Sequence, residues 1–167
     1  MLKALNTVIY RGFYILRAVA ALCLLTIVVI ITAGIITRYL FDKPFTWTEE
    51  LSTLLFIWLA FLGAAVVSAK RNHVAVDFIT EKFPPSMRKA IYIVTSVLIM
   101  ILLAIMFIGS IILMPTMTHK TVALQIPRYY NYIPIMIASF YMLLVYIEDL
   151  IHFIRPELFK NGLRIPA

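Results

Sequence analysis

The chain has 167 residues, of which 63% are apolar and only 14% are charged, and its mean hydropathy is +0.97. A soluble domain is about 45–50% apolar and about 25% charged, so this composition excludes a soluble enzyme, a disordered segment and a nucleic-acid-binding module. The formal net charge of +7 does not indicate nucleic acid, because basic residues in a membrane protein mostly report its topology. The single cysteine, Cys23, lies in an apolar run and is expected to be an inert membrane thiol.

Four uncharged, apolar runs are long enough to cross a membrane. A spanning helix needs about 20 apolar residues, and the runs predict spans at residues 18–37, 51–69, 90–114 and 129–147. We therefore predict an all-α integral membrane protein in which residues 1–167 form a single membrane domain. Lipid is the surrounding medium expected for these four helices.

The basic residues are distributed unevenly between the connections. Eleven of the fifteen lie before the first span, between the second and third spans, or after the last span. Lysine and arginine are enriched in cytoplasmic loops. Both termini are therefore predicted to be cytoplasmic, and residues 38–50 and 119–128 are predicted to face outward.

Short amphipathic helices are expected at the membrane surface. One is predicted at 74–83, where two prolines follow. Another is suggested by apolar residues at spacings of three and four before the first span, namely Leu2, Leu5, Ile9, Phe13 and Leu16. For this N-terminal segment a second interpretation is equally favoured, in which it simply extends the first span into the cytoplasm.

The third apolar run continues to Thr118 and is too long for one upright helix. At 1.5 Å per residue it would reach about 43 Å. Pro115 is therefore predicted to break the helix near the outer surface, which leaves residues 116–127 along the outer interface.

The second span carries a stripe of small residues. Ala60, Ala64 and Ser68 repeat every four residues, and Gly63 lies beside them. Such stripes let helices approach closely in lipid, and this one predicts packing either within the chain or against a helix of a partner subunit. Trp58 lies deeper in the span than an aromatic belt would place it, so its indole is expected to pack against protein.

None of the four predicted spans carries an Asp, Glu, Lys, Arg or His away from its ends. Transport and proton relay inside a bilayer usually need such a residue at mid-depth, so the chain is not expected to be a proton-coupled carrier by itself. Of the three histidines, His73 and His152 are predicted on the cytoplasmic side and His119 on the outer side. A haem held by His73 and His152 is the minor alternative to solvated surface histidines.

One stretch, from the first outer connection to the segment after the second span, has a recognisable pattern. Its segments are Arg38-Tyr39-Leu40-Phe41, Pro44, Trp47-Thr48-Glu49-Glu50-Leu51, Leu55-Phe56-Ile57-Trp58, Phe61-Leu62-Gly63-Ala64-Ala65, Arg71 and His73-Val74-Ala75-Val76-Asp77. This pattern resembles the small membrane subunit of tripartite ATP-independent periplasmic (TRAP) transporters, the DctQ-like family. The rest of the chain agrees with that family in hydropathy and length.

The resemblance implies a multi-pass protein of the bacterial inner membrane that takes part in uptake of organic acids, such as C4-dicarboxylates or sialic acids. In that family a periplasmic binding protein captures the substrate. A large membrane subunit then carries it, usually driven by a sodium gradient. The small subunit is implied to pair with the large one and stabilise it without catalysis. No cofactor is expected in this chain, and sodium coupling is expected in the large subunit.

The outer connections are expected to contact these partner proteins through charged residues that lie among aromatic ones. The candidates are Arg38, Lys43, Glu49, Glu50, Lys120 and Arg128. For Glu49 and Glu50 the simpler interpretation is that they complement the dipole at the start of a helix. A salt bridge to a partner subunit and a proton or cation site are the alternatives. The sequence leaves the roles of these two glutamates and of His73 open.

Two functions of other classes compete with this hypothesis. A membrane anchor for a redox enzyme would show a haem absorption band in the purified chain. A stand-alone small transporter would support uptake in vesicles that contain this chain alone. The identity of the organic acid does not follow from the sequence, because the family's substrate contacts are implied to lie in other subunits.

The distribution of basic residues predicts the pattern of labelling from outside the cell. In a chain without Cys23, single cysteines at Lys43 and Lys120 should react with an impermeant thiol reagent from the periplasm. Cysteines at Arg71 and Lys160 should react only after the membrane is opened. The opposite pattern would overturn the predicted orientation.

Overall fold

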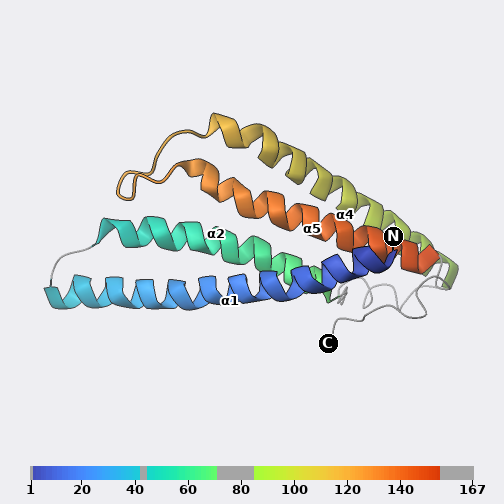
Figure 1. The fold of residues 1–167 in the computed structure, drawn as a ribbon, viewed down its shortest axis with the longest axis horizontal. Helices are drawn as coiled ribbons and strands as arrows, with labels where there is room; N and C mark the ends of the chain where they lie inside the picture. Colours follow the sequence, from blue (N-terminus) through green and yellow to red (C-terminus); the bar gives the residue numbers. More distant parts are fainter. Residues whose placement is uncertain (1, 42–44, 71–84, 155–167) are drawn as a thin grey trace.

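The computed structural model describes residues 2–41, 45–70 and 85–154 (Figure 1). Its long helices are α1 (Leu2–Phe41), α2 (Thr46–Ala69), α4 (Pro85–Leu113) and α5 (Tyr132–Ile154). Each contains a stretch long and apolar enough to cross a membrane, so the predicted all-α membrane fold with four spanning helices is confirmed. Lys43, His73 and the helix predicted at 74–83 lie outside the described residues, and the orientation of the termini stays a prediction.

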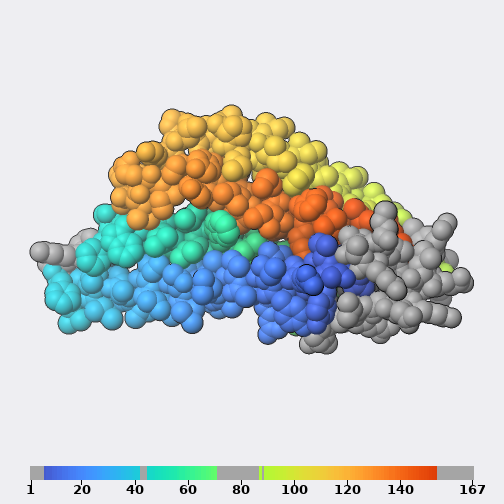
Figure 2. All heavy atoms as spheres, viewed as in Figure 1, coloured from blue at the N-terminus to red at the C-terminus, as the bar shows by residue number. Residues whose placement is uncertain are grey.

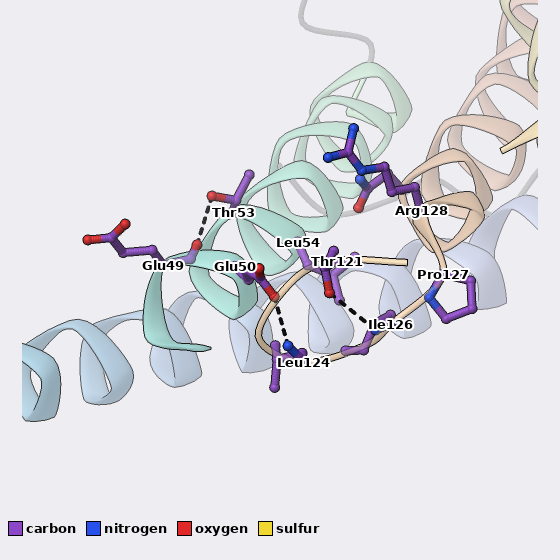
Figure 3. A pocket seen from close by; sticks show the side chains of 10 residues that line it. Glu49, Glu50, Thr53, Leu54, Thr121, Leu124, Ile126, Pro127 and Arg128 are labelled. Carbon is purple, nitrogen blue, oxygen red and sulfur yellow. Dashed lines mark hydrogen bonds between the residues drawn. The ribbon is translucent and has the colours of Figure 1, made fainter. Parts of the chain in front are cut away.

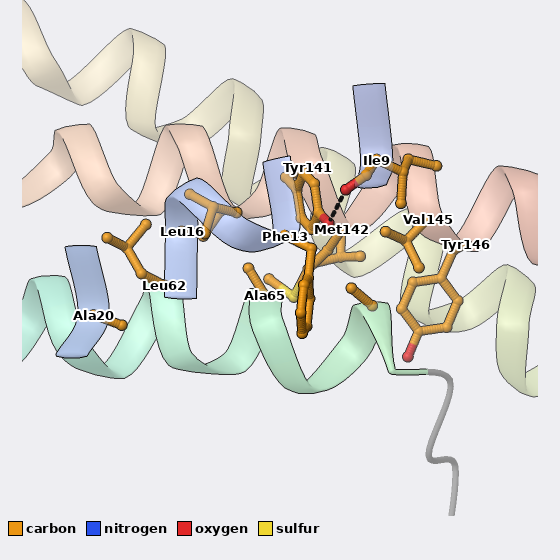
Figure 4. Close-up of a cluster of buried hydrophobic side chains, with 13 residues drawn as sticks. Ile9, Phe13, Leu16, Ala20, Leu62, Ala65, Tyr141, Met142, Val145 and Tyr146 are labelled. Atoms are coloured by element: carbon orange, nitrogen blue, oxygen red, sulfur yellow. Dashed lines mark hydrogen bonds between the residues drawn. The ribbon is translucent and has the colours of Figure 1, made fainter. Parts of the chain in front are cut away.

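Helix α1 is continuous through the N-terminal segment. It has 40 residues and is therefore about 60 Å long, about twice the thickness of the hydrocarbon core of a bilayer. The segment thus extends the first span, and it is not a separate interfacial helix. Its apolar stripe faces protein, because Ile9, Phe13 and Leu16 are buried against the other helices (Figure 4).

The break predicted in the third apolar run is confirmed. Helix α4 ends at Leu113 and is followed by a 3-10 turn, Met114–Thr116, that contains Pro115. Proline lacks a backbone N–H, and its ring clashes with the preceding turn of an α-helix. Residues 117–127 then leave the helix and fold back toward the start of α2 (Figure 1).

Helix α5 is the central element of the bundle. It packs against α1, α2 and α4, while α1 packs along α2 (Figures 1 and 2). Half of the most apolar stretch of α5 is buried, compared with 11–17% for the corresponding stretches of the other three helices. Ring contacts such as Phe107 against Phe140, with centroids 5.6 Å apart, join α4 to α5. Helices α1 and α4 therefore lie at the two edges of the bundle and expose most of their apolar surface.

The core depends on a close approach between α5 and the N-terminal half of α1 (Figure 4). The Tyr141 hydroxyl donates a buried hydrogen bond of 2.8 Å to the carbonyl oxygen of Ile9. A Cβ atom built on Gly12 would lie 2.6 Å from Cε2 of the Tyr141 ring. Glycine at this position is what allows the ring to lie directly against the backbone of α1.

We expect Gly12→Ala to destabilise the bundle, because the added methyl group would overlap the Tyr141 ring. Overpacking of a core in this way costs about 1–3 kcal/mol. Thermal unfolding of the purified chain in detergent, followed by circular dichroism, should show a lower midpoint. Gly109→Ala on α4 is the matched control, since a Cβ there meets nothing within 4 Å, and its midpoint should not fall.

A double-mutant cycle identifies the cause of that loss. In a Tyr141→Ala background the ring is gone, so Gly12→Ala should have little further effect on the midpoint. A loss of the same size in both backgrounds would show that the ring contact is not responsible.

Candidate partner-binding surface

Three segments meet at one end of the bundle: the C-terminal end of α1, the start of α2 and the connection between α4 and α5 (Figure 1). Charged residues singled out in the sequence lie here. Arg38, Glu49, Lys120 and Arg128 are exposed, and Glu50 is partly buried. Their grouping agrees with the prediction that residues 38–50 and 119–128 lie on one side of the membrane.

The connection from α4 to α5 forms a small hairpin. The backbone N–H of Thr121 donates to the carbonyl oxygen of Ile126 over 2.9 Å, and that of Arg128 donates to His119 over 2.9 Å. Lys120 and Pro127 form an isolated antiparallel bridge between the two sides. The Thr121 hydroxyl also accepts a bond of 3.2 Å from the Ile126 N–H. The hairpin (residues 119–128) therefore has a defined register, although it has no regular strands.

Glu50 fixes the tip of this hairpin to α2 (Figure 3). One carboxylate oxygen accepts a hydrogen bond of 2.9 Å from the Ala123 N–H, and the other accepts one of 2.9 Å from the Leu124 N–H. Hydrogen bonds to an ionised acceptor are stronger than neutral ones. Glu50 thus binds a backbone segment of its own chain. The sequence did not predict this partner.

Glu49 has a different partner. Its carboxylate lies 3.1 Å from a guanidinium nitrogen of Arg38 at the end of α1, and the two side chains are 76% and 56% exposed. An ion pair exposed to this degree contributes about 0–1 kcal/mol. The pair joins α1 to α2 only weakly, and both side chains are accessible to another protein.

A hollow of about 250 Å³ lies between the start of α2 and the hairpin (Figure 3). Its lining combines apolar and polar residues: Glu49, Glu50, Thr53, Leu54, Thr121, Leu124, Ile126, Pro127, Arg128 and Asn131. Both charge signs are present, so the hollow does not favour a single kind of small ion. Together with the exposed Lys120, it forms a chemically mixed surface of the kind that contacts proteins.

The small-residue stripe of α2 is divided between surface and interior. Ala60 and Ala64 are exposed, and a Cβ on Gly63 would meet nothing within 4 Å. The two alanines therefore do not pack against other helices of this chain. The buried face of α2 is formed by other residues, namely Leu62, Ala65 and Ala69. Ser68 is partly buried. Trp58 is also partly buried and packs against the core.

Sequence reasoning missed an acidic pair inside α5. Glu148 and Asp149 are 2% and 8% exposed, whereas the sequence placed Glu148 at the end of the last span. Helix α5 continues to Ile154, so both residues lie within the helix and not after it. A carboxylate directly after an apolar run was the available signal, but the sequence alone does not show which way such a residue faces.

Comparison with known proteins places the chain in a family. Residues 27–155 match the family of tripartite ATP-independent periplasmic transporters, DctQ component. A putative TRAP transporter small permease protein of Haemophilus influenzae is 33% identical over 110 residues, which cover 66% of each chain. These relatives are transporter permeases and not enzymes, so the redox-anchor alternative is not favoured.

Two other relatives are much longer than this chain. The sialic acid TRAP transporter permease protein SiaT of another Haemophilus influenzae strain is 42% identical over 60 residues, 36% of this chain but 10% of that protein. The isethionate TRAP transporter permease protein DctMQ of Oleidesulfovibrio alaskensis is 27% identical over 136 residues, 76% of this chain but 21% of that protein. The family match covers well over half of the present chain, which therefore belongs to the DctQ component family of tripartite ATP-independent periplasmic transporters.

Proposed function

We propose that this chain is the small permease subunit of a TRAP-type secondary transporter in the bacterial inner membrane, with both termini in the cytoplasm. In this proposal it pairs with a large membrane subunit and stabilises it without catalysis. The observation that carries the proposal is the match to DctMQ, in which a segment like most of this chain makes up about a fifth of a longer permease. In this proposal the rest of such a permease corresponds to the large membrane subunit.

The proposed substrate is an organic acid that a periplasmic binding protein delivers. Its uptake is proposed to be driven by an ion gradient. The names of two relatives specify sialic acid and isethionate, both of which are organic anions. Because those substrates differ so much, the choice among acids is assigned to other subunits. The coupling ion, proposed to be sodium, is also assigned to the large subunit. No predicted span of this chain carries an Asp, Glu, Lys, Arg or His at mid-depth, and the buried Glu148 and Asp149 lie in the last two turns of α5.

The exposed part of the small-residue stripe on α2 is the proposed contact with the large subunit. Ala60 and Ala64 are exposed in the isolated chain, and Phe56 and Val67 on the same helix are 63% and 59% exposed. Small side chains contribute little by facing lipid, but they allow a second helix to come close. The face is therefore suited to a transmembrane helix of the partner.

Ala64→Leu should weaken assembly with the large subunit, because a bulky side chain would separate the two helix backbones. Inserting such a group into a packed contact costs about 1–3 kcal/mol. Co-purification from membranes should show less large subunit per small subunit, while the unfolding midpoint of the isolated chain stays the same. Ala21→Leu, at an exposed alanine on α1, is the matched control. Equal recovery of the large subunit with both variants would remove α2 as the contact.

Arg128→Glu should lower uptake by weakening docking of the binding protein. Arg128 is exposed and borders the hollow beside the hairpin, and charge changes at such a rim mainly alter association rate and salt dependence. In vesicles that hold the complete transporter, the loss should shrink as the binding protein is raised to excess. Substrate preference should not change. Altered preference with unchanged dependence on the binding protein would instead place part of the substrate path in this subunit.

A further inference from the structure

We propose that Glu50 is a positioning residue: it holds the hairpin at residues 119–128 in the conformation that presents Lys120 and Arg128 to the periplasmic binding protein. The structural part of this inference stands on the contacts of Glu50 alone. The part that concerns docking rests on the proposed function.

The first observation is that Glu50 makes a two-point contact. Two consecutive backbone N–H groups, those of Ala123 and Leu124, donate to the two separate oxygens of its carboxylate, each over 2.9 Å. A carboxylate that accepts from two adjacent backbone groups fixes direction as well as distance. The hairpin tip is thereby attached to the first turns of α2.

The second observation is that the tip is exposed, and that its own side-chain bond runs from Gln125 Nε2 to the Val122 carbonyl oxygen over 3.0 Å. Val122 is 86% exposed, and Ala123 and Gln125 are also exposed. Gln125 has a φ of 54°, a left-handed conformation that residues other than glycine rarely adopt. The turn therefore contains one residue in an unfavourable backbone conformation, and the bonds that Glu50 accepts from Ala123 and Leu124 help to maintain it.

The third observation links the tip to the charged residues. Lys120 is paired with Pro127 across the hairpin, and Arg128 follows directly and donates its N–H to His119. The positions of these two side chains depend on the register of the hairpin. The His119–Arg128 bond fixes that register at the base of the hairpin, and Glu50 fixes it at the tip. Releasing Glu50 frees the tip and loosens the register in which Lys120 is paired with Pro127.

Glu50→Gln tests the structural part. The amide keeps the size of the side chain but loses the charge and replaces one acceptor oxygen with a donor, which cannot bond a backbone N–H. Hydrogen–deuterium exchange of the complete transporter should show the peptide over residues 119–128 exchanging at least about tenfold faster, the equivalent of one lost hydrogen bond. Peptides from α5 should not change, which confirms that the variant is folded.

Two controls isolate the contact. Glu49→Gln removes the same charge one residue away, but its carboxylate pairs with Arg38, so exchange in the hairpin should stay at the wild-type rate. Ser52→Ala removes a hydroxyl that donates to the Thr48 carbonyl oxygen within α2, and it should change neither exchange nor uptake. Unchanged exchange in Glu50→Gln, or an equal increase in Glu49→Gln, would overturn the positioning role.

Uptake measured against the concentration of binding protein tests the docking part. Glu50→Gln should raise the half-saturating concentration severalfold and leave the maximal rate intact. Thr121→Val removes the hydroxyl that accepts from Ile126 and that also bonds the Glu50 carboxylate. It loosens the same hairpin without changing any charge, so it should shift the curve in the same direction. A shift with Glu50→Gln alone would mean that its charge meets the binding protein directly, which contradicts the proposal.

Comparison with Arg128→Glu distinguishes a failure of the positioning role of Glu50 from a failure of the proposed docking surface. If the hairpin loosens in Glu50→Gln and docking is unaffected, while Arg128→Glu still weakens docking, the positioning proposal fails and the proposed function survives. If neither variant changes the dependence on binding protein, the docking surface itself is refuted.

Discussion

The contact between α5 and the N-terminal half of α1 organises the bundle. In lipid, helices gain little from burying apolar surface, so close packing and shared hydrogen bonds decide which helices associate. Gly12 removes the side chain that would hold the two helices apart, and the Tyr141 ring fills the space and bonds the Ile9 carbonyl oxygen. With α1 and α5 fixed in this way, α2 packs against both and α4 packs on α5.

At the opposite end of α1 the chain is held by charges as well as by close packing, because a Cβ built on Gly34 would lie 3.3 Å from the hydroxyl oxygen of Thr48. Two neighbouring glutamates at the start of α2 act in different directions, since Glu49 reaches back to α1 and Glu50 reaches across to the α4–α5 connection. The first contact is exposed and weak. The second uses both oxygens of the carboxylate on backbone groups, and it gives the connection a defined shape. One short segment of sequence thereby connects three parts of the bundle.

Hydropathy predicted the spanning helices because a bilayer requires a continuous apolar run, and Pro115 predicted the end of α4 because proline cannot continue a helix. It was harder to predict which side of each helix faces the interior of the bundle. The spacing of Ala60 and Ala64 suggested packing within the chain or with a partner, but an alanine suits either environment, and both proved exposed. The bonds of Glu50 to Ala123 and Leu124 could not be predicted either, because they join backbone groups whose positions depend on the packing of α5.

The contact of Glu50 also has a consequence for biogenesis. It joins segments that lie more than 70 residues apart in the chain, with two of the four spans between them. These two spans, α4 included, have to be synthesised and threaded before the N–H groups of Ala123 and Leu124 can reach the carboxylate. Until then Glu50 is a charged group at the mouth of an unfinished bundle, where it remains hydrated. The Glu50 contact therefore cannot form until α4, the third of the four spans, has crossed the membrane.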